Sequence, residues 1–311
     1  MSKFLVTGGA GFIGSHIVHA LVKAKHSVRV LDDFSSGKTQ NLEGVLKEID
    51  LIKGDIRCFN TCLKATKGMD YCLHQAALRS VPKSMNNPYE YNDVNINGTL
   101  NMLYASRDNK IKSFVCASSS SVYGETKNFP EKESFFPDPI SPYALSKLTG
   151  EYYCKIFSGH HGLPTVSLRY FNVFGPRQSL DDEYAVVIPK FITNMLKNEA
   201  PPIFGTGKQS RDFTYVDNVV QANILAAKTK KAYGGVFNVA SGKDYTILEL
   251  VKYLNVILNK NVSPKFLDKR PGDVFRTLAD LTNSKKVLGF NPKVSFIEGL
   301  KTTVEYFQKN F

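Results

Sequence analysis

Short apolar runs alternate with amphipathic stretches along the first half of the chain. Five runs have the length and apolar content of buried strands: residues 3–7, 27–32, 50–55, 70–74 and 113–118. Stretches with helical spacing of apolar residues separate them, as at 15–25 and 93–107. Strands that alternate with helices predict a parallel sheet with helices on both faces, so we expect a doubly wound, Rossmann-type α/β fold.

The pattern changes in the second half. Proline and glycine interrupt residues 173–212, whereas residues 213–240 return to helix and strand, and helical spacing recurs at 247–258 and 296–307. We therefore expect a cofactor domain and a smaller, discontinuous C-terminal α/β lobe that binds the substrate. Their predicted boundaries are 1–172 plus 213–240 for the cofactor domain, and 173–212 plus 241–311 for the lobe.

A glycine-rich loop joins the first predicted strand to the first helix, with Gly8, Gly11 and Gly14 at intervals of three residues. Glycines there permit a tight turn, a close approach of the backbone to a pyrophosphate, and close packing of helix on strand. Asp32 ends the second strand, where a carboxylate can accept hydrogen bonds from ribose hydroxyls and repels a 2′-phosphate. The pattern predicts a dinucleotide site that prefers NAD to NADP.

A tyrosine and a lysine, Tyr143 and Lys147, follow a serine cluster at residues 118–121 that ends the fifth strand. Residues at i and i+4 lie on one face of a helix, and an ammonium group there stabilises tyrosinate, whose phenol has an ordinary pKa of about 10. By itself such a pair is most often an ordinary helix surface. Beside a dinucleotide loop it becomes a candidate general base, with Ser119 placed to share the proton.

The composition of the chain limits the classes of partner that we expect it to bind. There are 40 Lys and Arg against 28 Asp and Glu, a net charge of +12, but the basic residues are spread along the chain without a nucleic-acid-binding motif. We expect no nucleic acid, and a surface that attracts anionic small molecules. The five cysteines suggest a reducing cytosol, no metal-ligand spacing occurs, and no apolar run approaches the ~20 residues of a membrane span.

Seven motifs together resemble those of the extended short-chain dehydrogenase/reductase family, specifically its nucleotide-sugar epimerases and dehydratases. They lie at residues 7–14, 74–77, 95–99, 118–124, 141–147, 168–172 and 211–217, so that the resemblance covers essentially the whole chain. It implies NAD as cofactor, a UDP-sugar as substrate, and a homodimer formed through the predicted helices 93–107 and 143–157.

The resemblance also implies roles for individual residues. Catalysis falls to Tyr143, with Lys147 and Ser119 in support. The expected NAD contacts, besides Tyr143, Lys147 and the three loop glycines, are Phe12, Ile13, Asp32, Asp33, Asp55, Ile56, Gln75, Ala76, Ala77, Arg79, Asn95 and Tyr170. The expected substrate contacts, besides Ser119 and Tyr143, are Ser120, Ser121, Asn172, Val187, Arg211, Arg270, Asp273 and Thr277. Arg211 and Arg270 would bind the diphosphate and Asp273 the uridine ribose. Guanidinium groups suit paired phosphate oxygens.

The serine cluster indicates the reaction. In this family, sugar 4,6-dehydratases carry Thr-Asp-Glu where this chain has Ser119, Ser120 and Ser121, and UDP-glucuronate decarboxylases carry glutamate in place of Ser121. Here only hydroxyl groups are available. By resemblance this leaves a 4-epimerase, which oxidises C4 of the sugar, turns the keto sugar over, and reduces it from the other side.

The sugar is less certain from the residues. A tyrosine at the position of Thr277 restricts family members to UDP-glucose and UDP-galactose, whereas a small residue leaves room for an N-acetyl group. Thr277 and the run 184–190 favour UDP-GlcNAc and UDP-GalNAc, with UDP-Glc and UDP-Gal as further candidate substrates. UDP-glucuronate 4-epimerase is the alternative, because Arg177 or Lys83 could meet a carboxylate. A non-catalytic NAD-binding regulator is the alternative of another class, although such proteins usually lose the Tyr/Lys pair.

Overall fold

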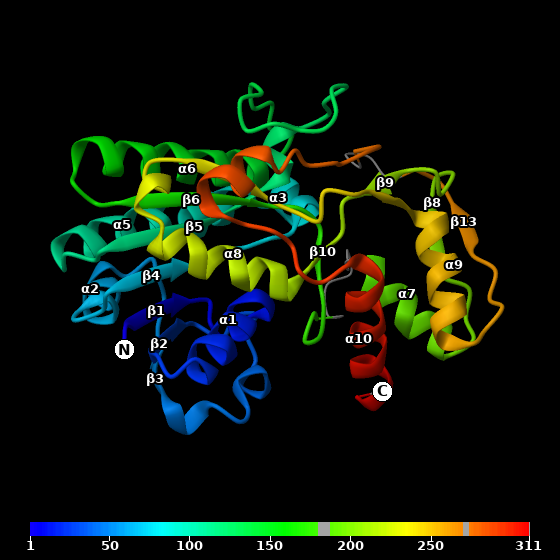
Figure 1. The fold of residues 1–311 in the computed structure, drawn as a ribbon, viewed down its shortest axis with the longest axis horizontal. Helices are drawn as coiled ribbons and strands as arrows, with labels where there is room; N and C mark the ends of the chain where they lie inside the picture. Colours follow the sequence, from blue (N-terminus) through cyan, green and yellow to red (C-terminus); the bar gives the residue numbers. More distant parts are fainter. Residues whose placement is uncertain (180–186, 270–273, 311) are drawn as a thin grey trace.

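A seven-stranded parallel sheet forms the centre of the larger part of the molecule in the computed structural model, which describes residues 1–179, 187–269 and 274–310 (Figure 1). The strand order is β11-β6-β5-β4-β1-β2-β3. The strands are β1 (Lys3–Thr7), β2 (Ser27–Asp32), β3 (Ile49–Lys53), β4 (Tyr71–His74), β5 (Ser113–Ser119), β6 (Thr165–Tyr170) and β11 (Val236–Val239). The predicted doubly wound α/β fold is confirmed.

Helices cover both faces of this sheet. Helices α1 (Phe12–Lys23) and α8 (Val216–Lys228) pack on one face, and α2 (Phe59–Thr66), α5 (Gly98–Asp108) and α6 (Pro142–His160) on the other. Successive side chains of β1 point to opposite faces of the sheet and are apolar on both, so helices must pack on both faces. Phe4 and Val6 belong to the hydrophobic cluster on one face of the sheet and Leu5 to the cluster on the other face, and all three are fully buried.

The predicted helix 93–107 is divided in the structure. A π-helical turn, η3 (Asn92–Asn97), precedes α5, and two short helices, α3 (Val81–Asn86) and α4 (Pro88–Tyr91), lead into it. Five further short helical segments lie between the strands and at the surface: η1 (Thr39–Leu42), η2 (Leu46–Glu48), η4 (Ser120–Tyr123), η5 (Lys230–Ala232) and η6 (Ser284–Leu288).

Three helices build a second hydrophobic core at the other end of the molecule (Figure 1). They are α7 (Val187–Leu196), α9 (Ile247–Leu258) and α10 (Phe296–Lys309), and Phe296 stacks on Phe213 and Tyr245. Three two-stranded sheets accompany them: β7 (Val173–Phe174) with β10 (Thr214–Tyr215), β9 (Ser210–Arg211) with β12 (Tyr245–Thr246), and β8 (Pro202–Phe204) with β13 (Lys265–Leu267). The residue boundaries of the two lobes stay a prediction.

The five cysteines are free thiols, and Cys58 alone among them is exposed. No helix of the described residues is long and apolar enough to cross a membrane. Within the same residues, no cluster of histidine, cysteine and carboxylate side chains has the arrangement of a metal site.

A buried ion pair ties α6 to the sheet. Arg169 on β6 donates from Nε and Nη2 to the two carboxylate oxygens of Glu151 on α6, at 2.9 and 2.7 Å. Glu151 is 4% exposed and Arg169 3%. Ser118 on β5 also donates to Glu151, and the Arg169 guanidinium lies 4.6 Å from the centroid of the Tyr123 ring. Because both charges are out of water, each depends on the other to offset its desolvation.

We predict that Glu151→Gln lowers the free energy of unfolding by about 3–5 kcal/mol, since the guanidinium of Arg169 stays buried without a counter-charge. Urea denaturation followed by circular dichroism measures the change. Asp50→Asn is the control, because it removes the partner of Arg29 from an exposed pair and should cost no more than about 1 kcal/mol. Equal losses in the two variants would contradict the role given to the buried pair.

Candidate active site

A cavity of about 1380 Å³ opens at the carboxyl ends of the parallel strands, between the sheet and the second core. Carboxyl ends of parallel strands are where open α/β sheets bind ligands. The described residues with a predicted role that line it are Gly8, Gly11, Phe12, Ile13, Gly14, Asp32, Asp33, Asp55, Ile56, Gln75, Ala76, Ala77, Arg79, Ser119, Ser120, Ser121, Tyr143, Lys147, Tyr170, Asn172, Arg211 and Thr277. The fold thus brings these residues to one space.

Two of the described residues with a predicted role, Val187 and Asn95, are not in this lining. Arg270 and Asp273 lie outside the described residues, as do residues 184–186 of the run that suggested an N-acetylated sugar. Val187 begins α7 away from the cavity wall. Asn95 is buried one layer behind the wall, with its side chain bonded to the backbone of Leu78.

The glycine loop has the shape of a pyrophosphate cradle. Gly8 has φ +64°, and a Cβ on it would lie 2.8 Å from the backbone nitrogen of Ala76. A Cβ on Gly14 would lie 2.1 Å from the carbonyl oxygen of Gly8, so that only glycine lets α1 approach β1 this closely. No side chain caps the start of α1, and its first N–H groups remain available to phosphate oxygens. The loop fits a dinucleotide.

Asp32 joins the loop to the end of β2. Its carboxylate accepts hydrogen bonds from the backbone N–H groups of Ala10, at 2.8 Å, and Phe34, at 2.9 Å. Burial raises the pKa of the carboxyl, and these two bonds oppose the rise. A carboxylate has about four acceptor positions, so capacity remains for two ribose hydroxyls.

The candidate catalytic group lies where β5 ends and α6 begins. Ser141 caps α6 by accepting from the N–H of Ala144 at 3.1 Å, which places Tyr143 in the first turn of the helix. Lys147, one turn later, donates from Nζ to the carbonyl oxygen of Ala117 at 2.9 Å. Ser119 accepts from the backbone N–H and the hydroxyl of Ser121, at 3.2 and 2.9 Å.

Burial is the largest influence on the pKa values of Tyr143 and Lys147. It raises the pKa of Tyr143, while the hydrogen bond with Ser119 and the charge of Arg79 act in the opposite direction. Burial likewise lowers the pKa of Lys147. Nζ of Lys147 donates to the carbonyl oxygen of Ala117 and lies 6.0 Å from the centroid of the Tyr143 ring, and its support of tyrosinate stays a prediction. Ser119 and Arg79 are two groups that favour tyrosinate.

Tyr91 and Ser146 support Tyr143 from two sides. The ring of Tyr91 meets that of Tyr143 edge to face at 6.4 Å between centroids, and its hydroxyl accepts from the N–H of Ser80. Ser146 donates to the carbonyl oxygen of Tyr143 and accepts from Asn95. These contacts hold the loop that carries Arg79 beside the phenol. His74, to which we gave no chemical role, is buried between Thr7 and Thr99.

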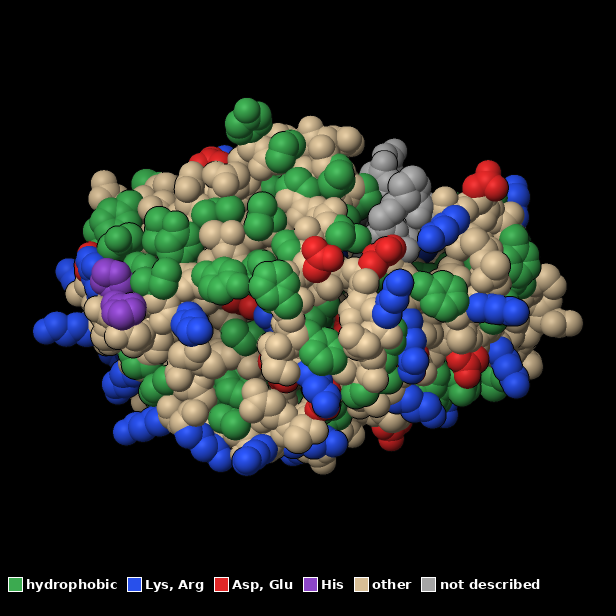
Figure 2. Space-filling view, turned by 90° about the horizontal axis from the view of Figure 1, so that it is seen from above, with side chains coloured by type: hydrophobic (Ala, Val, Ile, Leu, Met, Phe, Trp, Pro, Cys, Tyr) green, Lys and Arg blue, Asp and Glu red, His purple; other side chains and the backbone are tan. Residues whose placement is uncertain are grey.

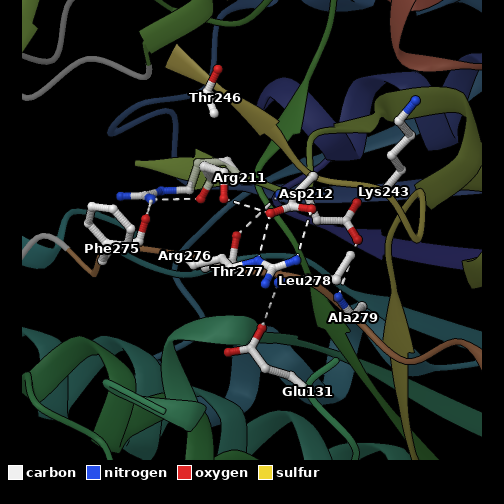
Figure 3. A network of polar contacts seen from close by, with 12 residues as sticks. Glu131, Arg211, Asp212, Lys243, Thr246, Phe275, Arg276, Thr277, Leu278 and Ala279 are labelled. Atoms are coloured by element: carbon white, nitrogen blue, oxygen red, sulfur yellow. Dashed lines mark hydrogen bonds and ion pairs between the residues drawn. The ribbon is translucent and has the colours of Figure 1, made fainter. Parts of the chain in front are cut away.

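The far end of the cavity is formed by Asn172, Thr277 and Arg211. Asn172 donates from Nδ2 to the hydroxyl of Thr277 at 2.9 Å and to the carbonyl oxygen of Asp212 at 3.3 Å. Arg211 is held by the carbonyl oxygens of Ser210 and Phe275, at 2.9 and 3.2 Å (Figure 3). The end of α10 also reaches the lining through Tyr306, Phe307 and Asn310, which no sequence motif indicates.

Residues 4–240 match the model of the NAD dependent epimerase/dehydratase family. The chain belongs to this family. Membership confirms the predicted resemblance and NAD as the cofactor, and it identifies the chain as an enzyme of that family.

Among curated relatives, a putative UDP-glucose 4-epimerase of Methanocaldococcus jannaschii is 37% identical over 98% of this chain and 98% of its own length. Among solved structures, a UDP-N-acetylglucosamine 4-epimerase of Methanobrevibacter ruminantium in complex with UDP-N-acetylmuramic acid is 45% identical. Its TM-score is 0.96 over 100% of this chain and 99% of that chain. A UDP-glucuronic acid 4-epimerase of Bacillus cereus, solved with a fluorinated UDP-glucuronic acid and NAD, is 34% identical. Its TM-score is 0.92 over 99% of this chain and 100% of that chain.

We predict that Asp32→Asn weakens NAD binding by about tenfold to a hundredfold, because a charged acceptor of ribose hydroxyls is lost. The variant should also lose part of the discrimination against NADP, since Asp32 then no longer repels the 2′-phosphate. Titration calorimetry of both cofactors against wild type and variant measures this. A wild-type protein that binds NAD and NADP equally well would contradict the assignment of Asp32.

Proposed function

We propose that this chain is a UDP-hexose 4-epimerase that interconverts UDP-GlcNAc and UDP-GalNAc, with UDP-Glc and UDP-Gal as further substrates. The observation that carries the proposal is the composition of the cavity wall around Tyr143. Segments 117–121 and 140–147 contribute the phenol, the ammonium of Lys147 and serine hydroxyls, but no carboxylate, to the lining. Glu151, the carboxylate behind Ser118, is neutralised by Arg169 and is not part of the lining.

The proposed chemistry needs one group that accepts and returns a proton. Tyr143, as tyrosinate, takes the proton of the sugar 4-hydroxyl, and Ser119 stabilises the tyrosinate through the hydrogen bond that favours this form. When bound, NAD supplies the acceptor and then the donor of the hydride at C4. After the sugar turns over, Tyr143 returns the same proton to the oxygen on C4. Elimination or decarboxylation would call for a carboxylate at the position of Ser120 or Ser121, where this chain has hydroxyl groups.

The diphosphate and uridine would lie at the end of the cavity that Arg211 lines, with Arg270 and Asp273 as the further proposed contacts. Val187 stays a proposed substrate contact. By the same resemblance, Asn95 acts on the cofactor side. Its two hydrogen bonds to the backbone of the lining residue Leu78 support an indirect role of this kind.

Support for an N-acetylated sugar comes from Thr277. This small side chain lines the cavity and leaves space that a tyrosine would fill. The similar protein of Methanobrevibacter ruminantium acts on UDP-N-acetylglucosamine. UDP-glucuronate is the second candidate, because Arg177 and Lys83 also line the cavity and could meet a carboxylate, and because a UDP-glucuronic acid 4-epimerase is structurally similar.

A substrate panel tests the proposal. Purified protein is incubated with UDP-GlcNAc, UDP-Glc and UDP-GlcA separately, and the 4-epimers are resolved by chromatography. We expect the highest kcat/KM with UDP-GlcNAc. Tyr143→Phe should bind NAD normally but lose about 10²–10⁴-fold in kcat, because the general base is gone. Absence of any 4-epimer would refute the function, and a preference for UDP-GlcA would select the second candidate.

We also propose a homodimer formed through α5 and α6. Large apolar side chains on these helices are exposed, with Leu145 at 53%, Tyr152 at 52% and Ile156 at 45% on α6, and Tyr104 at 36% on α5. Leu145, Tyr152 and Ile156 are spaced by seven and four residues, which places them on one face of the helix. Hydrophobic side chains gather on this side of the molecule in Figure 2. Two such helix pairs from two subunits would form a four-helix interface.

The double variant Tyr152→Glu, Ile156→Glu should be a folded monomer, because two carboxylates cannot be buried unpaired at an apolar interface. Size-exclusion chromatography with light scattering gives the mass. Val256→Glu is a matched control, since Val256 is a similarly exposed apolar residue on α9, away from the proposed interface. A wild-type monomer, or a double variant that stays dimeric, would contradict the proposed interface.

A further inference from the structure

Thr277 belongs to an extended segment held from two sides. This segment, residues 275–280, makes one parallel bridge at Arg276 with Ser210 and another at Ala279 with Glu131. Backbone bonds join Asp212 N to Thr277 O at 3.0 Å and Glu131 N to Leu278 O at 2.7 Å. The position of Thr277 in the cavity wall is therefore set by residues around 131 and 212, far from it in the sequence.

Two buried carboxylates bind consecutive N–H groups of this segment from opposite sides (Figure 3). Glu131, 1% exposed, accepts from the N–H of Leu278 at 3.2 Å. Asp212, fully buried, accepts from the N–H of Ala279 at 3.3 Å. Consecutive residues of an extended chain present their N–H groups to opposite sides, which is why the segment needs one acceptor on each side.

Asp212 links this segment to two others. Its carboxylate also accepts from the N–H and hydroxyl of Ser241, at 2.8 and 2.7 Å, and from the N–H of Gly242, at 3.0 Å. Its own N–H donates to the hydroxyl of Thr277 at 3.2 Å, and its carbonyl oxygen accepts from Asn172. With Asn172 bonded to Thr277 as well, the side chains at this end of the cavity form one connected network.

We propose that Asp212 and Glu131 are positioning residues that hold Thr277, and through it Asn172, in the geometry that binds the sugar of the substrate. Neither side chain lines the cavity, so both act through the 275–280 segment. The inference rests on the proposed function, because it presupposes that a UDP-linked sugar lies against Thr277 and Asn172.

Burial gives the network a pH dependence. It raises the pKa of Glu131 to about 8 and the pKa of Asp212 to about 6. The charged groups that act on Glu131 are Asp212, which raises its pKa, and Arg211 and Arg169, which lower it. Between pH 6 and 8 Asp212 is ionised and Glu131 neutral. Above about pH 8 both are charged on the two sides of one segment, and their repulsion disfavours the arrangement.

The test measures binding and does not depend on turnover. Dissociation constants for UDP-GlcNAc, UDP-Glc and UDP are measured by calorimetry from about pH 6.5 to about pH 9. At every pH, the dissociation constant of each UDP-sugar is divided by that of UDP. Ionisations that affect both ligands equally cancel in this ratio. For the wild type we expect this ratio to rise several-fold above about pH 8, because only the sugar contacts Thr277 and Asn172.

Glu131→Gln keeps an acceptor for Leu278 without a charge, so the ratio should match the wild type at pH 7 and stay level above pH 8. Glu131→Ala and Asp212→Asn should raise the ratio by about tenfold at every pH, because N–H groups of the network lose their acceptor. Glu133→Gln is the matched control. Burial also raises the pKa of Glu133, but its carboxylate accepts from the N–H of Asn238 and not from Leu278 or Ala279. It acts on the segment through the charge of Asp280, at the end away from Thr277, so its profile should equal that of the wild type.

Two results would overturn the proposal: a wild-type ratio that is constant with pH, or a Glu131→Gln variant that keeps the alkaline rise. A variant that weakens UDP and UDP-sugars equally would show general structural damage in place of positioning, and so would also count against it. Failure of the proposed function would be seen in a different experiment. The wild type would then convert none of the UDP-sugars into its 4-epimer, independently of the ratios of dissociation constants.

Discussion

The ion pair between Glu151 and Arg169 is the interaction on which the rest of the active site depends. It fixes the middle of α6 against β6, and Ser118 adds a bond from β5. Tyr143 and Lys147 lie in the two turns before Glu151, so their distance from the strand ends follows from this attachment. Because the pair is buried, α6 has little freedom to slide or rotate without separating two desolvated charges.

A second layer of contacts sets the surroundings of the phenol. Asn95 connects the loop after β4 to Ser146 on α6, and Ser146 in turn binds the carbonyl oxygen of Tyr143. Arg79 is carried on that loop, and its charge favours tyrosinate. The ammonium group of Lys147 is held by the backbone of β5, to which it donates a hydrogen bond. The proposed general base is therefore surrounded by groups on three separate elements.

The two ends of the cavity differ in what holds them. At the cofactor end, the glycine loop and Asp32 are local features, built on β1, α1 and β2 and braced by backbone hydrogen bonds. At the sugar end, Asn172, Arg211 and Thr277 come from segments far apart in the chain and are joined through Asp212. The first end resembles the general dinucleotide-binding fold. The second is where family members can differ in the sugar that they accept.

Much of this protein was determined by its sequence alone. Periodicity predicted six of the seven central strands, β1 to β5 and β11. The spacing of Gly8, Gly11, Gly14 and Asp32 predicted the cofactor loop. Both are short-range patterns with a direct backbone cause. The pair of Tyr143 and Lys147 was equally visible. Strand β6 was not predicted, although its residues Thr165–Tyr170 favour a strand, and the division of the helix at η3 has no signal in the periodicity.

Only the tertiary structure decided the direction of the pKa shift of Tyr143, the place of Asn95 behind the wall, and the contribution of α10 to the cavity. It also revealed Glu131 and Asp212 as partners of the segment that carries Thr277. Burial and the meeting of distant segments govern these features, and neither is encoded in a local spacing of residues. A sequence motif can therefore name the groups that do the chemistry, while the packing around them sets their charge and their position.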